Sequence, residues 1–320
     1  MLQTVTESDK TDIQLLVDDP AELASQVGNT PLLRLDRIAS EAQILPDVKI
    51  YAKAEWFNPS GSVKDRPALN IIRTAEQSGL LMPGMTLLDS TSGNMGIAYA
   101  MFCASREYKV RLTLPENASR ERIAIIKAYG AEVILTDPLE GSDGALREAQ
   151  RLAARAGDQV FYAGQYDNPA NWQAHYYTTA NEIWAQSGGQ ITHFVAGLGT
   201  SGTFMGTSRR LKELNPSIRA VSVQPDSPFN GLEGLKHMQT GIQPGIYDPV
   251  QADSQVEIRT EDAYEMARTL ARRQGLFVGF SAAAAVVAAL RVASQLTAGV
   301  VVTVLPDNGY KYLGERLWME

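Results

Sequence analysis

The chain of 320 residues is poor in several residue types on which common protein chemistries depend. Its one cysteine, Cys103, cannot form an internal disulfide, so we expect a reducing, cytoplasmic environment. Cys103 lies in the apolar run 98–104, which predicts a buried helix and an unreactive thiol. The histidines His175, His193 and His237 are scattered, without metal-ligand spacing or a nucleophile motif. We therefore expect no metal site and no catalytic histidine.

Long apolar runs and blocks of basic residues are also missing. No apolar run reaches the roughly 18 residues of a membrane-spanning helix, and the longest candidate, 280–290, is alanine-rich. Residues 1–20 lack the basic start and apolar core of a secretory signal peptide. The net charge is −7 and no cluster of Lys and Arg stands out. We therefore expect neither nucleic acid nor a membrane as a partner.

Short apolar or β-branched runs alternate along the chain with longer helical patterns, which favours βαβ units and a mostly parallel sheet. The predicted strands are 32–35, 49–55, 86–89, 109–114, 132–135, 159–163, 192–196, 218–224 and 299–305. The predicted helices are 64–77, 94–106, 120–129, 142–156, 169–186, 203–214, 260–274 and 281–296. Residues 225–257 contain several Pro and Gly and predict a long irregular loop, which in a compact protein is usually functional or mobile.

Lys64 is the most informative residue because of its position and because three other polar loops accompany it in the chain. It lies between a predicted strand and a predicted helix, where open α/β sheets bind ligands. A single lysine at the start of a helix is usually a solvated charge. Lysine is also the side chain that forms a Schiff base with a carbonyl, as pyridoxal phosphate requires. Three further polar loops in the chain make the second interpretation the better one.

The loop Thr91-Ser92-Gly93-Asn94 follows the predicted strand 86–89 and begins a helix. Hydroxyl groups, a glycine and the first amides of a helix suit a carboxylate. Because Ser, Thr and Asn are also the favoured helix caps, these residues alone predict a plain cap equally well.

The segment Gly199-Thr200-Ser201-Gly202-Thr203 again stands between a strand and a helix, and its hydroxyls and free amides suit a phosphate. No lysine follows the last glycine, so the segment is not a Walker loop. Ser281 follows Gly279-Phe280 at the start of an alanine-rich helix. It is either a helix cap or a hydrogen-bond partner of a pyridine nitrogen.

Taken in order, these segments resemble the fold-type II pyridoxal phosphate enzymes, in particular the cysteine synthases (O-acetylserine sulfhydrylases) and their B-type branch. The resemblance begins at Gly28-Asn29-Thr30-Pro31-Leu32 and extends to 305–313, almost the whole chain. It implies an α/β fold like that of tryptophan synthase β, with two domains that each hold a mostly parallel sheet with helices on both faces. Residues 58–158 would form a smaller, mobile domain for the substrate carboxylate. Residues 1–57 together with 159–320 would form a larger domain for the cofactor phosphate.

The resemblance also implies a role for each segment. Lys64 would be the catalytic lysine that holds pyridoxal 5′-phosphate, and Asn94 would bind its 3′ oxygen. The phosphate would lie among Gly199, Thr200, Ser201, Gly202 and Thr203, and Ser281 would meet the pyridine nitrogen. The substrate-binding residues would be Thr91, Ser92, Asn94, Met95 and Gln165.

The implied activity is β-replacement on an O-activated L-serine by sulfide, which gives L-cysteine through an α-aminoacrylate. Fold-type II relatives are usually homodimers, so we expect one here. Nothing in the sequence supports a serine acetyltransferase partner, which the family allows. A catalytically silent binding protein of the same fold is the alternative outside the enzymes, and the intact surroundings of Lys64 argue against it.

Two of the positions that depart from the family pattern bear on the choice of substrate. Met95 stands where relatives usually carry threonine, which removes a donor from the carboxylate loop. Asp226 stands where relatives that use O-phosphoserine can carry arginine, and its charge would repel a phosphate. We therefore expect O-acetylserine to be preferred. The alternative is a synthase that uses O-phosphoserine or an amino-acid nucleophile such as glutamate, because Met95 and 171–176 also resemble a siderophore-pathway branch.

Overall fold

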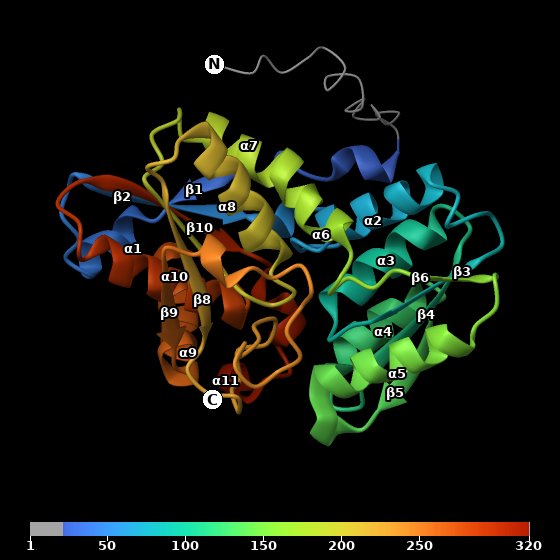
Figure 1. Ribbon diagram of the computed structural model, residues 1–320. Helices are drawn as coiled ribbons and strands as arrows, with labels where there is room; N and C mark the ends of the chain where they lie inside the picture. Colours follow the sequence, from blue (N-terminus) through green and yellow to red (C-terminus); the bar gives the residue numbers. More distant parts are fainter. Residues whose placement is uncertain (1–21, 320) are drawn as a thin grey trace, which may run out of the picture.

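The structure is a computed structural model that describes residues 22–319, so the expectation for residues 1–20 lies outside the described residues. Two sheets organise the chain (Figure 1). The larger sheet has the strand order β1 (Leu32–Arg34), β2 (Val48–Ala54), β10 (Gly299–Leu305), β7 (His193–Gly197), β8 (Arg219–Pro225) and β9 (Ser254–Ile258). The smaller sheet has the order β5 (Glu132–Thr136), β4 (Lys109–Pro115), β3 (Thr86–Ser90) and β6 (Val160–Tyr162).

Neighbouring strands run parallel in both sheets, except that β1 pairs antiparallel with β2. The predicted α/β fold with two mostly parallel sheets is therefore confirmed. The smaller sheet includes β6, which lies beyond the expected domain boundary at residue 158. That boundary and the mobility of the smaller domain stay predictions.

Helices cover both faces of the larger sheet because its strands are apolar on both sides. In β10, Val301 and Leu305 pack into one core, while Val300, Val302 and Val304 pack into another. The first core holds α1 (Asp36–Glu41), α9 (Thr260–Thr269), α10 (Phe280–Ala293) and Leu317 of α11 (Arg316–Met319). The second core holds α7 (Ala180–Gln186) and α8 (Gly202–Leu214).

The smaller sheet has its own core. The helices α2 (Asp65–Gln77), α3 (Asn94–Ala104) and α4 (Arg120–Ala128) share that core with β3 and β4, and Ala170 of α6 (Pro169–Ala174) joins them. The helix α5 (Gly141–Arg155) also packs on β3 and β4, where its backbone accepts a hydrogen bond from Thr113. Cys103 is fully buried in α3, and burial raises the pKa of its thiol to about 12, as expected for an unreactive core cysteine.

The predicted irregular segment 225–257 is wrong at its end, because Ser254–Ile258 forms β9. These residues alternate polar and apolar side chains, and Ile258 is buried, which is the pattern of a half-buried edge strand. The predicted helices 169–186 and 260–274 each contain a π-helical turn, at His175–Thr179 and Leu270–Gln274. No helix within residues 22–319 is long and apolar enough to cross a membrane.

Candidate active site

The candidate site lies where strands of both sheets end. A cavity of about 440 Å³ there is lined by loops that follow β3 and β7, and a second cavity of about 50 Å³ adjoins it. Lys64, Asn94, Gly199 and Thr200 line both cavities. The larger cavity adds Thr91, Ser92, Met95 and Gln165, and the smaller one adds Ser201, Gly202, Thr203 and Ser281. The structure thus brings together every residue that the sequence predicts for the site.

Lys64 caps α2, and the chain before it is tied to the larger sheet because Val63 N donates to Pro306 O at 2.8 Å. Burial lowers the pKa of the Lys64 amine to about 8, against the opposing effect of the Asp307 carboxylate. An imine-forming lysine needs a neutral amine, so this shift favours the proposed chemistry near neutral pH.

Sequence reasoning missed a polar network that holds Asn94. Asn94 Nδ2 donates to Asp307 Oδ2 at 2.7 Å, and the Tyr312 hydroxyl donates to the same oxygen at 2.8 Å. Lys311 Nζ donates to Asn94 Oδ1 at 2.9 Å and to Ser60 O at 3.0 Å. Asp307 comes soon after the buried strand that ends at Leu305. A carboxylate at the carboxyl end of a parallel strand was the available signal.

The segment 199–203 forms a tight cradle at the start of α8. Ser201 has a left-handed backbone (φ 67°), and its buried Oγ has no hydrogen-bond partner among the described residues. A Cβ on Gly202 would lie 2.0 Å from Asn171 Oδ1, and a Cβ on Gly199 would lie 2.4 Å from Gly234 O. Only glycine fits at both places, so the backbone can approach a ligand closely. The free amides and the helix start suit a phosphate.

The loop 91–94 is partly satisfied by its own contacts. Thr91 Oγ1 accepts hydrogen bonds from Gly93 N at 2.9 Å and Gly96 N at 3.1 Å. Gln165 Nε2 donates to Ser90 O at 2.6 Å. Met95 is 3% exposed and contributes no hydroxyl. The donors available to a carboxylate are therefore the hydroxyls of Thr91 and Ser92, the second N–H of Gln165 Nε2 and the first two amides of α3.

Ser281 is the second residue of α10 and is buried beside the smaller cavity. Its Oγ lies 3.4 Å from where a Cβ on Gly234 would be, so Gly234 leaves space next to this hydroxyl. The position suits a hydrogen bond to a flat ring held between Lys64 and the cradle.

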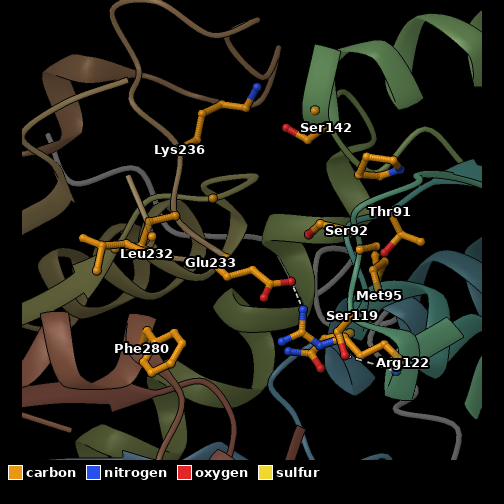
Figure 2. Close-up of a pocket in the computed structure, with 18 of the residues that line it drawn as sticks. Thr91, Ser92, Met95, Ser119, Arg122, Ser142, Leu232, Glu233, Lys236 and Phe280 are labelled. Carbon is orange, nitrogen blue, oxygen red and sulfur yellow. Dashed lines mark hydrogen bonds and ion pairs between the residues drawn. The ribbon is translucent and has the colours of Figure 1, made fainter. Parts of the chain in front are cut away.

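Two cations, Arg122 and Lys236, also line the larger cavity, although neither is among the site residues predicted from the sequence (Figure 2). Arg122 of α4 forms an ion pair with Glu233, and Lys236 forms one with Asp143 of α5. Glu233 and Lys236 belong to residues 226–247, which we call the strap. Asp226, in contrast, is exposed and lines neither cavity, so it does not supply the repulsion of phosphate that we inferred from the sequence.

Comparison with known proteins agrees with this geometry. The model of the family described as pyridoxal-phosphate dependent enzyme matches residues 23–307. The chain belongs to this family. Its cofactor is pyridoxal phosphate, as the sequence predicts. The buried lysine, the glycine cradle and the unpartnered Ser201 hydroxyl fit that group.

Among the members of this family, the chain is similar to proteins named cysteine synthase or O-acetylserine sulfhydrylase. The chain is 51% identical to a cysteine synthase of Aquifex aeolicus over 298 residues, which is 92% of this chain and 91% of the relative. It is 43% identical to cysteine synthase B of Pseudomonas aeruginosa, covering 92% of this chain and 97% of the relative. A crystal structure of O-acetylserine sulfhydrylase isoform 3 from Entamoeba histolytica matches with a TM-score of 0.87 and 35% identity, covering 94% and 92% of the two chains.

Proposed function

We propose that this enzyme converts O-acetyl-L-serine and sulfide into L-cysteine and acetate. The observation that carries the proposal is one cavity system in which a lysine with a lowered pKa lies beside both a carboxylate loop and a phosphate cradle. The similarity to proteins named cysteine synthase supports the choice of sulfide as the nucleophile.

Pyridoxal phosphate, when bound, supplies an electron sink that acidifies the substrate's Cα–H bond. In the proposed arrangement Lys64 binds it, Asn94 meets its 3′ oxygen, and Ser281 meets its ring nitrogen. The segment 199–203 binds its phosphate. The carboxylate of the amino acid lies at Thr91, Ser92, Asn94, Met95 and Gln165.

Lys64 also moves a proton in the proposed reaction. Once the substrate's amino group has taken the place of Lys64 on the cofactor, the freed, neutral Nζ would take the proton from Cα while the Cβ–O bond breaks and acetate leaves with the bonding electrons. Sulfide then forms the Cβ–S bond, and Lys64 returns the proton to Cα. Because burial keeps the pKa of this amine near 8, the amine can both accept and donate the proton near neutral pH.

The chain's own domains are proposed to control water. Residues 58–158 would move toward the larger domain when the loop at Thr91 binds a carboxylate, which would exclude water from the reacting atoms. The strap supports this proposal, since it contacts α5 across the cavity through Lys236 and Asp143. We further propose a cytoplasmic homodimer, by resemblance to the family.

The test of the function uses purified enzyme and three donors: O-acetylserine, O-phosphoserine and serine. Each donor is incubated with sulfide or with glutamate, and the amino-acid product is identified. We expect cysteine from O-acetylserine and sulfide with the highest kcat/KM. A higher kcat/KM for O-phosphoserine would show that the donor is assigned wrongly. A product containing glutamate would show that sulfide is not the nucleophile.

A further inference from the structure

Arg122 is a buried cation for which the proposed reaction has no role. Its side chain is 2% exposed and lines the larger cavity. One guanidinium nitrogen pairs with Glu233 and the guanidinium also interacts with the Tyr312 hydroxyl, but Nε and Nη2 make no well-aligned hydrogen bond to the described residues. The guanidinium carbon lies 4.5 Å from the centre of the Tyr312 ring. Guanidinium donors are costly to leave unused when they are buried, so this arrangement is that of an anion site.

The position of Arg122 points to the amino acid's carboxylate. A Cβ on Gly93 would lie 2.3 Å from Arg122 Cδ and 3.1 Å from both Nε and Nη1, so the side chain runs directly alongside the loop 91–94. Thr91 and Gln165 offer only neutral donors beside the loop, and Met95 adds none. A guanidinium therefore supplies a positive charge that the loop itself lacks.

Glu233 holds the place of a ligand carboxylate in this structure. It reaches Arg122 from the strap on the opposite side of the cavity (Figure 2). Glu233 is 30% exposed and can return to water at small cost, whereas Arg122 cannot leave its buried position as easily. An incoming carboxylate can thus replace Glu233 without leaving a buried charge unpaired.

We propose, on the basis of the function proposed above, that Arg122 is a specificity-determining residue that pairs with the α-carboxylate of the amino-acid substrate. Glu233 is its counter-ion until the substrate binds. The enzyme then recognises the carboxylate by a charge as well as by the amides of α3. When the substrate carboxylate replaces Glu233 on Arg122, the strap loses its ion pair with α4. Substrate binding therefore changes how the strap is held.

The test measures binding of L-serine and L-serinamide to the holoenzyme by titration calorimetry and by the visible spectrum. The two ligands differ only in the carboxylate, and serine lacks a good leaving group. Arg122→Gln should lower the affinity for serine by about tenfold or more, which is the scale of a lost charge-assisted hydrogen bond, and should leave the affinity for serinamide nearly unchanged. Glu233→Gln should raise the affinity for serine by about threefold, because the partly exposed carboxylate that competes for Arg122 is removed.

Asp167→Asn is the matched control. Asp167 also contacts the strap, because its Oδ1 accepts from Gly245 N at 2.9 Å. This variant changes the net charge as Glu233→Gln does but frees no cation in the cavity, so serine should bind as in the wild type. Arg122→Lys keeps the charge and should recover part of the serine affinity. Thermal melting of each variant reports any loss of folding.

If Arg122→Gln and Glu233→Gln each lowered the affinity for serine and for serinamide by the same factor, the ion pair would be merely structural and the proposal would be overturned. Two other results would also overturn it. In one, Arg122→Gln binds serine as the wild type does but no longer binds inorganic phosphate, which would make Arg122 a phosphate contact. In the other, the wild-type holoenzyme binds no serine. The readout does not involve sulfide. If serine behaves as expected but no cysteine forms from O-acetylserine, only the proposed overall reaction fails.

Discussion

At the residue scale, Lys64 shows how a position acquires chemistry from its surroundings. The amine lies at the start of a helix, yet it faces a cavity and the buried carboxylate of Asp307. Burial favours the neutral amine and Asp307 favours the charged one, and burial wins, because the pKa falls to about 8. A single solvated lysine in the same sequence context would have none of these properties.

Replacing Lys64 by alanine should abolish the reaction. We expect kcat to fall by about a thousandfold or more, the scale of a lost acid–base group, with the loss of the visible absorbance of cofactor bound to the amine. Steady-state rates and an absorbance spectrum of the purified variant measure both. Normal turnover in Lys64→Ala would refute its role.

Replacing Ser281 should change the reaction without removing it. Ser281→Ala loses one uncharged hydrogen bond, so we expect kcat/KM to fall by about tenfold. Ser281→Asp should favour a protonated ring nitrogen and alter the spectrum of the bound cofactor. If neither variant changes the rate or the spectrum, Ser281 is only a helix residue.

The lowered pKa of Lys64 should appear in the stability of the cofactor-free protein. Below pH 8 the lysine is charged in both states, and the folded state carries the full cost of a buried charge. Between about pH 8 and 10.5 the unfolded state binds more protons than the folded one, so the free energy of unfolding rises with pH. Lys64→Met should therefore be more stable than the wild type at pH 7, with the difference shrinking toward pH 10.5.

Denaturant unfolding at pH 7, 8, 9 and 10 would measure this difference. Lys109→Met, at an exposed position of β4, is the control for removing a lysine from the surface. A constant difference between Lys64→Met and the wild type across this range would contradict the inferred shift.

The sequence predicted the residues with a motif and missed those defined by tertiary contacts. Lys64, Asn94 and Ser281 were found because each begins a helix after a strand-like run or an apolar segment. Arg122 was missed because it stands inside an ordinary amphipathic helix, and its partner Glu233 is distant in the chain. Asp226 was given a role that its exposed position does not support.

At the scale of elements, the glycines of the segment 199–203 can be tested without touching any proposed catalytic group. Gly202→Ala would place a methyl group 2.0 Å from Asn171 Oδ1, and Asn171 donates to Thr200 Oγ1 at 3.0 Å. The cradle must shift, so we expect the dissociation constant of pyridoxal phosphate to rise by about tenfold or more, since overpacking typically costs about 1–3 kcal/mol.

Fluorescence titration of the cofactor-free variant with pyridoxal phosphate measures that constant. Gly157→Ala is the matched control, because a Cβ there meets nothing within 4 Å and the backbone does not require glycine. It should bind the cofactor as the wild type does. Unchanged cofactor binding in Gly202→Ala would show that the segment does not hold the phosphate.

The elements themselves were predicted well where the pattern was long. Nine of the described strands and the main helices coincide with apolar or β-branched runs in the sequence, and most side chains of the seven-residue strands β2, β4, β8 and β10 are buried. The edge strand β9 was missed because it is only five residues long and directly follows a Pro- and Gly-rich loop. The helices α1 and α11 were missed because they are also short.

At the scale of the whole molecule, the two sheets share a site but have separate cores. The strap connects them across the cavity. Asp143 of α5 pairs with Lys236 and accepts from Ile242 N at 2.8 Å, and Ile246 N donates to Tyr166 O at 3.3 Å. The network of Asn94, Asp307 and Lys311 also joins the two parts, so the strap is one of the elements that a relative movement of the domains must strain or tighten.

Binding of an amino acid should therefore change the strap more than either core. If residues 58–158 close over the substrate, the Ile242 amide should exchange hydrogen more slowly with L-serine present, because closure strengthens its contact with Asp143 of α5. Amides of α10, inside the larger core, should be unaffected. Hydrogen exchange of the holoenzyme with and without serine measures both regions. Asp143→Asn should reduce the protection in the strap. Equal protection with and without serine would mean that carboxylate binding and domain closure are not coupled.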